Sequence, residues 1–213
     1  MPRPVLHDYF RSSAAYRVRI ALNLKQVDYD QRQVDLRGGG QQSEAYRALN
    51  PQGLVPMLEI DGLRLTQSLS IMVYLDQRFP EPLLMPRDPA DGAHVRAMAL
   101  AIACDIHPLN NLRVLKYLKA ELGQDQAAID RWYAHWLNEG LAALEQMAAP
   151  RAGAFLFGDR PSLADVCLVP QLYNARRFDV ALDAYPTLLR ADGNANQIAE
   201  FAAAHPDRQE VGQ

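Results

Sequence analysis

Residues 10–22 read FRSSAAYRVRIAL, from Phe10 to Leu22. The segment that leads into them, from Pro4 to Phe10, is short and rich in β-branched and aromatic residues, which favours a strand. Apolar residues then recur at helical spacing up to Leu22. The stretch therefore predicts the end of a buried strand, a tight polar turn, and a helix that begins at Ser12 or Ser13.

This helix start has two possible uses. Unpaired N–H groups and the positive end of the helix dipole favour an anion beside Ser12 and Ser13, and a thiolate held there has a lowered pKa. A serine before a helix is also the ordinary N-cap. These residues alone leave both interpretations open.

Composition places the chain among ordinary globular proteins. Its 213 residues allow one large domain or two small ones, and 49% are apolar and 22% charged. A net charge of -3 gives no electrostatic reason to expect a nucleic-acid partner. The chain shows neither a secretory apolar core at its start nor an apolar run long enough for a membrane helix. We therefore expect a cytoplasmic protein with no membrane partner.

The two cysteines, Cys104 and Cys167, are far apart and form no Cys-x-x-Cys motif. Both lie in segments with a helical pattern. We predict two buried, reduced thiols rather than a disulfide, and no metal site.

The N-terminal part has the element order of a thioredoxin-like domain. A second alternating run, Val27–Leu36, predicts a strand, and Asp61-Gly62 between two apolar runs predicts a hairpin. A helix follows, with Ser68 as its candidate cap. Strand, helix, strand, helix, hairpin and helix indicate a mixed α/β domain over residues 1–80. Without a Cys-x-x-Cys motif, disulfide exchange is not its function.

Pro56 stands inside the first run of the hairpin. It predicts either an edge strand, because proline has no N–H to pair, or a cis Val55–Pro56 bond that turns the backbone of Val55 toward a ligand.

The rest of the chain predicts an all-helical domain. Residues 81–89 are rich in proline and predict a linker. No strand pattern follows Leu65, and we expect a helical domain over residues 90–213 that ends in a loose polar tail from Asp207. Its expected helices span residues 90–122 with a bend at His107-Pro108, residues 129–147, a segment opened by the capping box of Ser162 and Asp165, and residues 185–206.

The opening string resembles that of zeta-class glutathione transferases, whose motif runs Ser-Ser-Cys-x-Trp-Arg-Val-Arg-Ile-Ala-Leu. Here the same string runs from Ser12 to Leu22, with Ala14 in place of the cysteine and Tyr16 in place of the tryptophan. Further similar stretches cover nearly the whole chain: Ala48–Pro51, Val55-Pro56, Thr66–Ser68, Leu168–Gln171, Ala175–Phe178 and His205–Gln209. The resemblance implies the two-domain glutathione transferase fold, glutathione as cofactor, and a homodimer. It also favours the cis form of the Val55–Pro56 bond.

The resemblance implies a role for each matching residue of the first domain. Ser12 would donate to the glutathione sulfur, with Ser13 nearby. Val55 would bind the cysteinyl backbone, and Gln67 and Ser68 the γ-glutamyl end. Gln41 would lie near the glycine end. Each residue taken singly is also a plausible cap or loop residue.

In the helical domain, the resemblance makes His107, Asn111 and Arg113 contacts of glutathione or substrate. Two consecutive asparagines in a helix are unfavourable, which suggests a local purpose. Arg11, Arg113 and Arg177 are the candidates for binding substrate carboxylates, because a guanidinium matches a carboxylate in shape and charge. A solvated surface arginine is the common alternative.

The resemblance implies a glutathione-dependent isomerase that converts maleylacetoacetate to fumarylacetoacetate in tyrosine and phenylalanine breakdown. Maleylpyruvate isomerisation in gentisate breakdown is the close alternative, since the absence of cysteine at Ala14 weakens the choice of substrate. A general conjugating glutathione transferase and a non-catalytic interaction module are the two other classes. The arginines argue against the first, and the intact Ser12, Gln67 and Ser68 argue against the second.

Overall fold

The computed structural model describes residues 2–209, and their contacts group into two compact units. The first runs to Leu83 and also takes in the segment from Gln197 onward, and the second is Leu84–Asn196. The division after Leu83 falls inside the stretch that the sequence predicts as a linker. The C-terminal segment was expected in the helical domain, but its contacts lie with the first unit.

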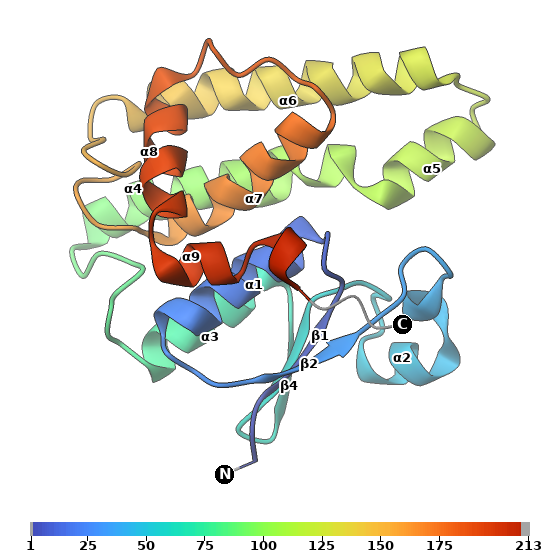
Figure 1. Ribbon diagram of the computed structural model, residues 1–213, viewed down its shortest axis with the longest axis horizontal. Coiled ribbons are helices and arrows are strands. Elements are labelled where there is room, and N and C mark those ends of the chain that lie inside the picture. Colours follow the sequence, from blue (N-terminus) through green and yellow to red (C-terminus); the bar gives the residue numbers. More distant parts are fainter. Residues whose placement is uncertain (1, 210–213) are drawn as a thin grey trace. The chain divides into compact units, whose positions relative to one another are not determined.

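The first unit has the α/β order expected from the sequence (Figure 1). Its elements are β1 (Val5–Asp8), α1 (Ser13–Leu24), β2 (Asp30–Gln33), the 3-10 turn η1 (Gly40–Gln42), α2 (Glu44–Leu49), β3 (Met57–Ile60), β4 (Leu63–Thr66), α3 (Ser68–Arg78), α9 (Ala199–Ala203) and the 3-10 turn η4 (Pro206–Arg208).

The strands of this unit form one sheet in the order β2-β1-β3-β4. β1 pairs in parallel with β2 and antiparallel with β3, and β4 pairs antiparallel with β3. The hairpin turn is where the sequence predicts it: Asp61 and Gly62 both have positive φ, 52° and 78°, which a two-residue turn of this kind requires. Helices α1 and α3 pack against each other, and α9 lies beside α1 (Figure 1).

The second unit is helical among its described residues. Its elements are α4 (Pro89–Leu100), the π-helical segment η2 (Ala101–Ile106), the 3-10 turn η3 (Pro108–Asn110), α5 (Leu112–Ala120), α6 (Gln126–Ala148), α7 (Leu163–Arg177) and α8 (Pro186–Asn196). The predicted capping box is present, because the Ser162 side chain accepts from the N–H of Asp165 while the Asp165 carboxylate accepts from the N–H of Ser162 at 2.8 Å. The single helix predicted for residues 90–122 is instead four short elements.

Three local predictions are wrong. Ser68 is not the cap of α3 but its first residue, and Gln67 is the N-cap. Cys104 is exposed, because it lies on the opposite side of η2 from the buried Ile102 and Ile106; Cys167 is buried, and neither cysteine forms a disulfide. The tail from Asp207 was expected to be loose, but up to Gln209 it is held by hydrogen bonds, and its remaining residues lie outside the described part.

Residues 2–209 contain neither a membrane-spanning helix nor a cluster of metal ligands. None of their helices combines the length and apolar character needed to cross a membrane. None of their His, Cys, Asp and Glu side chains gather in a group of three or more that could hold a metal ion.

Candidate functional site

One edge of the sheet collects the candidate residues of the first unit. Because β1 is antiparallel to β3 and β3 to β4, the end of β1, the start of β3 and the end of β4 lie at this edge. The end of β2, parallel to β1, lies there too. The segments that leave or enter at this edge carry the predicted residues Ser12, Gln41, Val55, Gln67 and Ser68.

Ser12 is the N-cap of α1. Its backbone is extended (φ −72°, ψ 118°), and its Oγ accepts a hydrogen bond of 3.2 Å from the N–H of Ala15. Accepting this bond leaves the hydroxyl hydrogen available, and no hydrogen bond of the described residues uses it. The half-buried Ser12 is therefore both a cap and a possible donor to an anion at the N-terminus of α1. Ser13 is buried at the first helical position.

The groups of Val55 that are available to a ligand are those of its main chain. The Val55–Pro56 bond is cis, which confirms the expectation from the resemblance. The preceding carbonyl, of Leu54, accepts hydrogen bonds from the Tyr46 hydroxyl (2.8 Å) and the Asn50 amide (2.7 Å). Because the Leu54–Val55 peptide is trans, its N–H points away from these donors. Neither the N–H nor the C=O of Val55 has a hydrogen-bond partner within residues 2–209.

Burial keeps the supporting tyrosine a donor. The pKa of Tyr46 is raised to about 12, mainly by desolvation and slightly offset by a hydrogen bond to Asn50. Its hydroxyl therefore stays protonated above pH 10, where an exposed tyrosine would ionise.

The start of α3 holds two candidates in different environments. Gln67 has φ 69°, which is unusual for a residue with a side chain, and its amide donates to the Gln52 side chain at 2.9 Å. Ser68 is buried, and its Oγ accepts from Nη1 of Arg17 at 3.3 Å. Arg17 itself is buried and was not predicted as a site residue. An arginine inside an otherwise apolar helix face is the signal that could have identified it.

Gln41, on η1, lies against the turn that precedes Val55. A Cβ added at Gly53 would come within 3.0 Å of the Gln41 carbonyl oxygen, so the two backbones are in close approach. The side-chain Oε1 of Gln41 is buried and has no hydrogen-bond partner in the described part of the chain. A buried acceptor without a partner is uncommon and is explained by a ligand or a water.

Arg11 stands in the turn between β1 and α1. Its guanidinium is exposed and lies 5.0 Å from the centre of the Phe10 ring, with no carboxylate partner in the described structure. It is therefore available for an external anion.

In the second unit, the predicted helix around His107 is interrupted. Asn111 is the N-cap of α5, with its Oδ1 accepting from the N–H of Arg113 at 3.1 Å, and Asn110 donates to the Tyr133 carbonyl at 3.2 Å. Asn111 is thus explained by a helix start, and Asn110 by its hydrogen bond to α6. His107 is half-buried between η2 and η3, and Arg113 is exposed with no side-chain partner in the described residues.

The two neighbouring arginines of α7 have different partners. Arg176 forms an ion pair of 2.6 Å with Asp192, whereas the exposed Arg177 donates, among residues 2–209, only to the Asn174 side chain, at 3.3 Å. Arg177 also lies near the face of the Tyr173 ring, 5.8 Å from its centre. Of the two, Arg177 is therefore the arginine whose positive charge is available to a ligand.

Comparison with known proteins agrees with the fold of both parts of the chain. Residues 6–83 match the family model described as "Glutathione S-transferase, N-terminal domain", and residues 126–194 match "Glutathione S-transferase, C-terminal domain". The chain is 50% identical over 208 residues to a probable maleylacetoacetate isomerase of Vibrio cholerae, covering 96% of each chain.

Two solved structures are similar over nearly their whole length. One is a holo structure of maleylpyruvate isomerase, a bacterial zeta-class glutathione S-transferase (TM-score 0.94, 42% identity, 96% of this chain and 98% of that one). The other is maleylacetoacetate isomerase from Anaeromyxobacter dehalogenans with glutathione bound in its active site (TM-score 0.88, 44% identity, 97% and 96%).

Proposed function

Because the chain belongs to the glutathione S-transferase family, in its zeta class, we propose that it is a glutathione-dependent isomerase that converts maleylacetoacetate to fumarylacetoacetate. The observation that supports this most is the single sheet edge at which Ser12, Val55 and the start of α3 are assembled.

The groups at this edge fit glutathione, which is a tripeptide with a thiol and two carboxylates. Val55 offers a backbone N–H and C=O that no described residue uses, as an extended peptide requires. The N-terminus of α3 suits the γ-glutamyl carboxylate, which Gln67 and Ser68 would bind. The unpartnered Oε1 of Gln41 suits a donor near the glycine end.

Glutathione, when bound, supplies a thiolate that adds reversibly to the cis double bond and so permits rotation about it. The role of Ser12 is to donate its hydroxyl hydrogen to the sulfur while its Oγ keeps the capping bond to Ala15. The positive end of the α1 dipole, where Ser13 is the first helical residue, adds positive potential. Together they favour the ionised thiol at neutral pH.

The substrate carries two carboxylates. We propose that Arg11, Arg113 and Arg177 bind them, since these exposed guanidinium groups have no carboxylate partner in the described residues. His107 and Asn111 are proposed to contact glutathione, Asn111 through the amide nitrogen that its capping bond leaves free. A reaction on apolar electrophiles would not need such arginines.

A second candidate, maleylpyruvate isomerase, is favoured by the replacement of the class cysteine with Ala14 and by the similar maleylpyruvate isomerase structure. The same residues would serve both reactions, because the two diacids differ only beyond the keto group. A homodimer and a cytoplasmic location belong to the same proposal and rest on the family resemblance. Sedimentation should give twice the mass of the chain, and cell fractionation should recover it with cytoplasmic markers.

Steady-state assays of the two diacids and of a chlorinated aromatic electrophile, each with glutathione, test the proposal. We expect turnover of at least one diacid and little conjugation of the aromatic. Conjugation of the aromatic with no isomerisation of either diacid would instead establish a general transferase.

A further inference from the structure

Arg19 is a fully buried arginine on α1, with 0% of its side chain exposed. Its guanidinium bonds to three separate segments. Nη1 donates to both carboxylate oxygens of Asp8 at 2.8 Å, Nη2 to the Phe10 carbonyl at 3.0 Å, and Nε to the Ala204 carbonyl at 3.0 Å. Arg19 therefore links the end of β1, the turn before α1, and the C-terminal segment.

Asp8, the carboxylate partner of Arg19, stays charged in the interior only because of this ion pair. Burial raises the pKa of Asp8, and the charge and hydrogen bonds of Arg19 partly offset that effect. An isolated charge at this depth is strongly unfavourable, so the pair persists only with its geometry intact. The orientation of Arg19 is thus closely defined.

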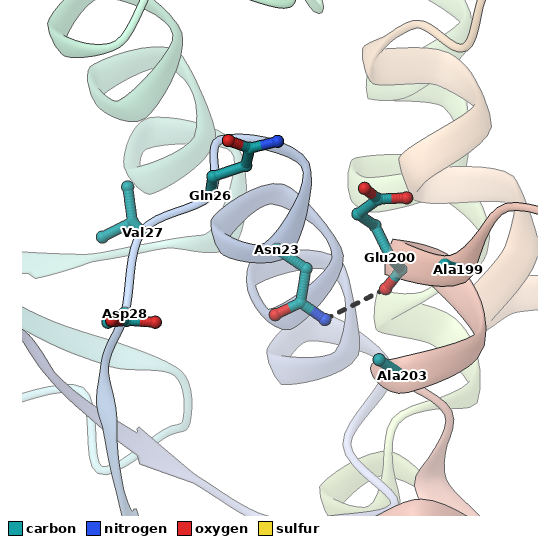
Figure 2. Close-up of a pocket in the computed structure, with 7 residues that line it drawn as sticks. All are labelled: Asn23, Gln26, Val27, Asp28, Ala199, Glu200 and Ala203. Atoms are coloured by element: carbon teal, nitrogen blue, oxygen red, sulfur yellow. Dashed lines mark hydrogen bonds between the residues drawn. The ribbon is translucent and has the colours of Figure 1, made fainter.

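The C-terminal segment is held against α1 by further contacts. Asn23 donates from its amide to the Glu200 carbonyl at 3.0 Å, as Figure 2 shows at the hollow between α1 and α9. Phe201 is completely buried, and the His205 ring meets the Tyr16 ring edge-on, with the ring centres 6.1 Å apart. The Ala204 carbonyl is consequently a fixed acceptor for Arg19.

The turn that carries Arg11 and Ser12 has few other constraints. Ser12 donates its N–H to the Tyr9 carbonyl at 2.8 Å, while the Phe10 carbonyl has Arg19 as its sole hydrogen-bond donor among the described residues. The Phe10 carbonyl belongs to the planar peptide that joins Phe10 to Arg11, so fixing it fixes the direction in which the chain enters Ser12.

We propose that Arg19 is a positioning residue of the thiolate site. By holding the Phe10 carbonyl it sets the turn that presents Arg11 and Ser12, and through Ala204 it makes the C-terminal segment part of the scaffold of that site. This inference rests on the proposed function, because it assumes that Ser12 acts on the sulfur of bound glutathione.

The test compares Arg19→Lys and Asp8→Asn with Lys25→Gln. Lys25 is a matched control, because it is also a buried cation of the α1 region, with an ion pair of 2.6 Å to Asp76, but it stands at the C-terminal end of the helix. Arg19→Lys keeps the positive charge but lacks the planar fork that reaches three acceptors at once. Steady-state kinetics and the thiolate absorbance of enzyme-bound glutathione are measured well below each variant's melting temperature.

We expect Arg19→Lys to lower kcat roughly a hundredfold, as small displacements of a catalytic group do. The apparent pKa of bound glutathione should rise, and Asp8→Asn should shift both quantities in the same direction by a smaller amount. The KM for glutathione should stay near the wild-type value, because Val55 and the start of α3 hold the peptide. Lys25→Gln should melt earlier but keep the wild-type kcat and thiol pKa.

A wild-type kcat and thiol pKa in folded Arg19→Lys would overturn the inference, and so would failure of both Arg19→Lys and Asp8→Asn to fold, which would assign the pair a purely structural role. If instead the wild-type protein neither ionises bound glutathione nor isomerises a diacid, the proposed function is wrong, and the variants are not needed to show it.

Discussion

Removal of the Ser12 hydroxyl is the perturbation that most directly separates its two roles. In Ser12→Ala, α1 loses its capping bond from the N–H of Ala15, which should lower the free energy of unfolding by about 1 kcal/mol. The bound sulfur also loses a hydrogen-bond donor. By analogy with removing one donor to a developing anion, this should cost about 2 to 4 kcal/mol of transition-state stabilisation. That corresponds to roughly a thirtyfold to thousandfold loss of kcat/KM.

Two variants control for the cap. Ser12→Thr keeps a hydroxyl that can cap and donate, and should retain most of the activity. Asp125→Ala removes the equivalent cap of α6, where the carboxylate accepts from the N–H of Ala128 at 2.7 Å. It should lose similar stability and keep its activity. Thermal melts and diacid isomerisation measured on the same preparations compare the two losses. A wild-type rate in Ser12→Ala would refute the reasoning and would mean that Ser13 and the helix end suffice.

Three further variants test other parts of the structure. Arg177→Gln should raise the KM for the diacid at least tenfold with little change in melting temperature. Arg176→Gln should instead lower the melting temperature, because it leaves the buried Asp192 carboxylate without its ion pair. Equal effects of the two substitutions on KM would contradict this assignment. Gly140→Ala should destabilise by about 1 to 3 kcal/mol in denaturant titrations, because the added Cβ would lie 2.2 Å from Cγ1 of Ile106, and the same substitution should cost less in an Ile106→Ala background, where that atom is absent. Burial raises the pKa of Asp165 from 3.8 to about 6, so the folded state holds this proton to higher pH than the unfolded state does. The free energy of unfolding of the wild type, relative to that of Asp165→Asn, should therefore fall by up to about 3 kcal/mol as pH rises from 4 to 6. A difference that does not depend on pH over that range would contradict the shift.

The elements with strong local chemistry could be predicted from the sequence. The start of α1, the Asp61-Gly62 turn and the capping box of Ser162 and Asp165 each depend on residues a few positions apart. The cis bond before Pro56 followed from the family resemblance, since the residues alone also allowed an edge strand.

The features that the sequence did not predict depend on contacts between residues that are far apart in the chain. Arg19 is a charged residue that sequence reasoning places at the surface by default, and its burial requires Asp8 and the Ala204 carbonyl, which is 185 positions away. The same interaction, with the burial of Phe201 and the hydrogen bond from Asn23 to Glu200, holds the segment from Gln197 onward to the first unit. No local sequence pattern indicates the burial of Arg19 or the contacts of the C-terminal segment with the first unit.

The interruption of the helix near His107 was only partly foreseen. Pro108 predicted a bend, but not the π-helical segment before it, which packs against α6 where Gly140 admits Ile106, nor the new cap at Asn111. Asn111, which looked unfavourable within a helix, is favourable as the N-cap of α5.

The central claim is that glutathione acts as a recycled cofactor, ionised beside Ser12, rather than as a consumed substrate. Its most direct test is the ratio of diacid isomerised to free thiol lost, measured with glutathione far below the diacid concentration. We expect complete conversion of the diacid with all of the thiol recovered. Conversion that stops when one thiol has been consumed for each diacid would contradict it.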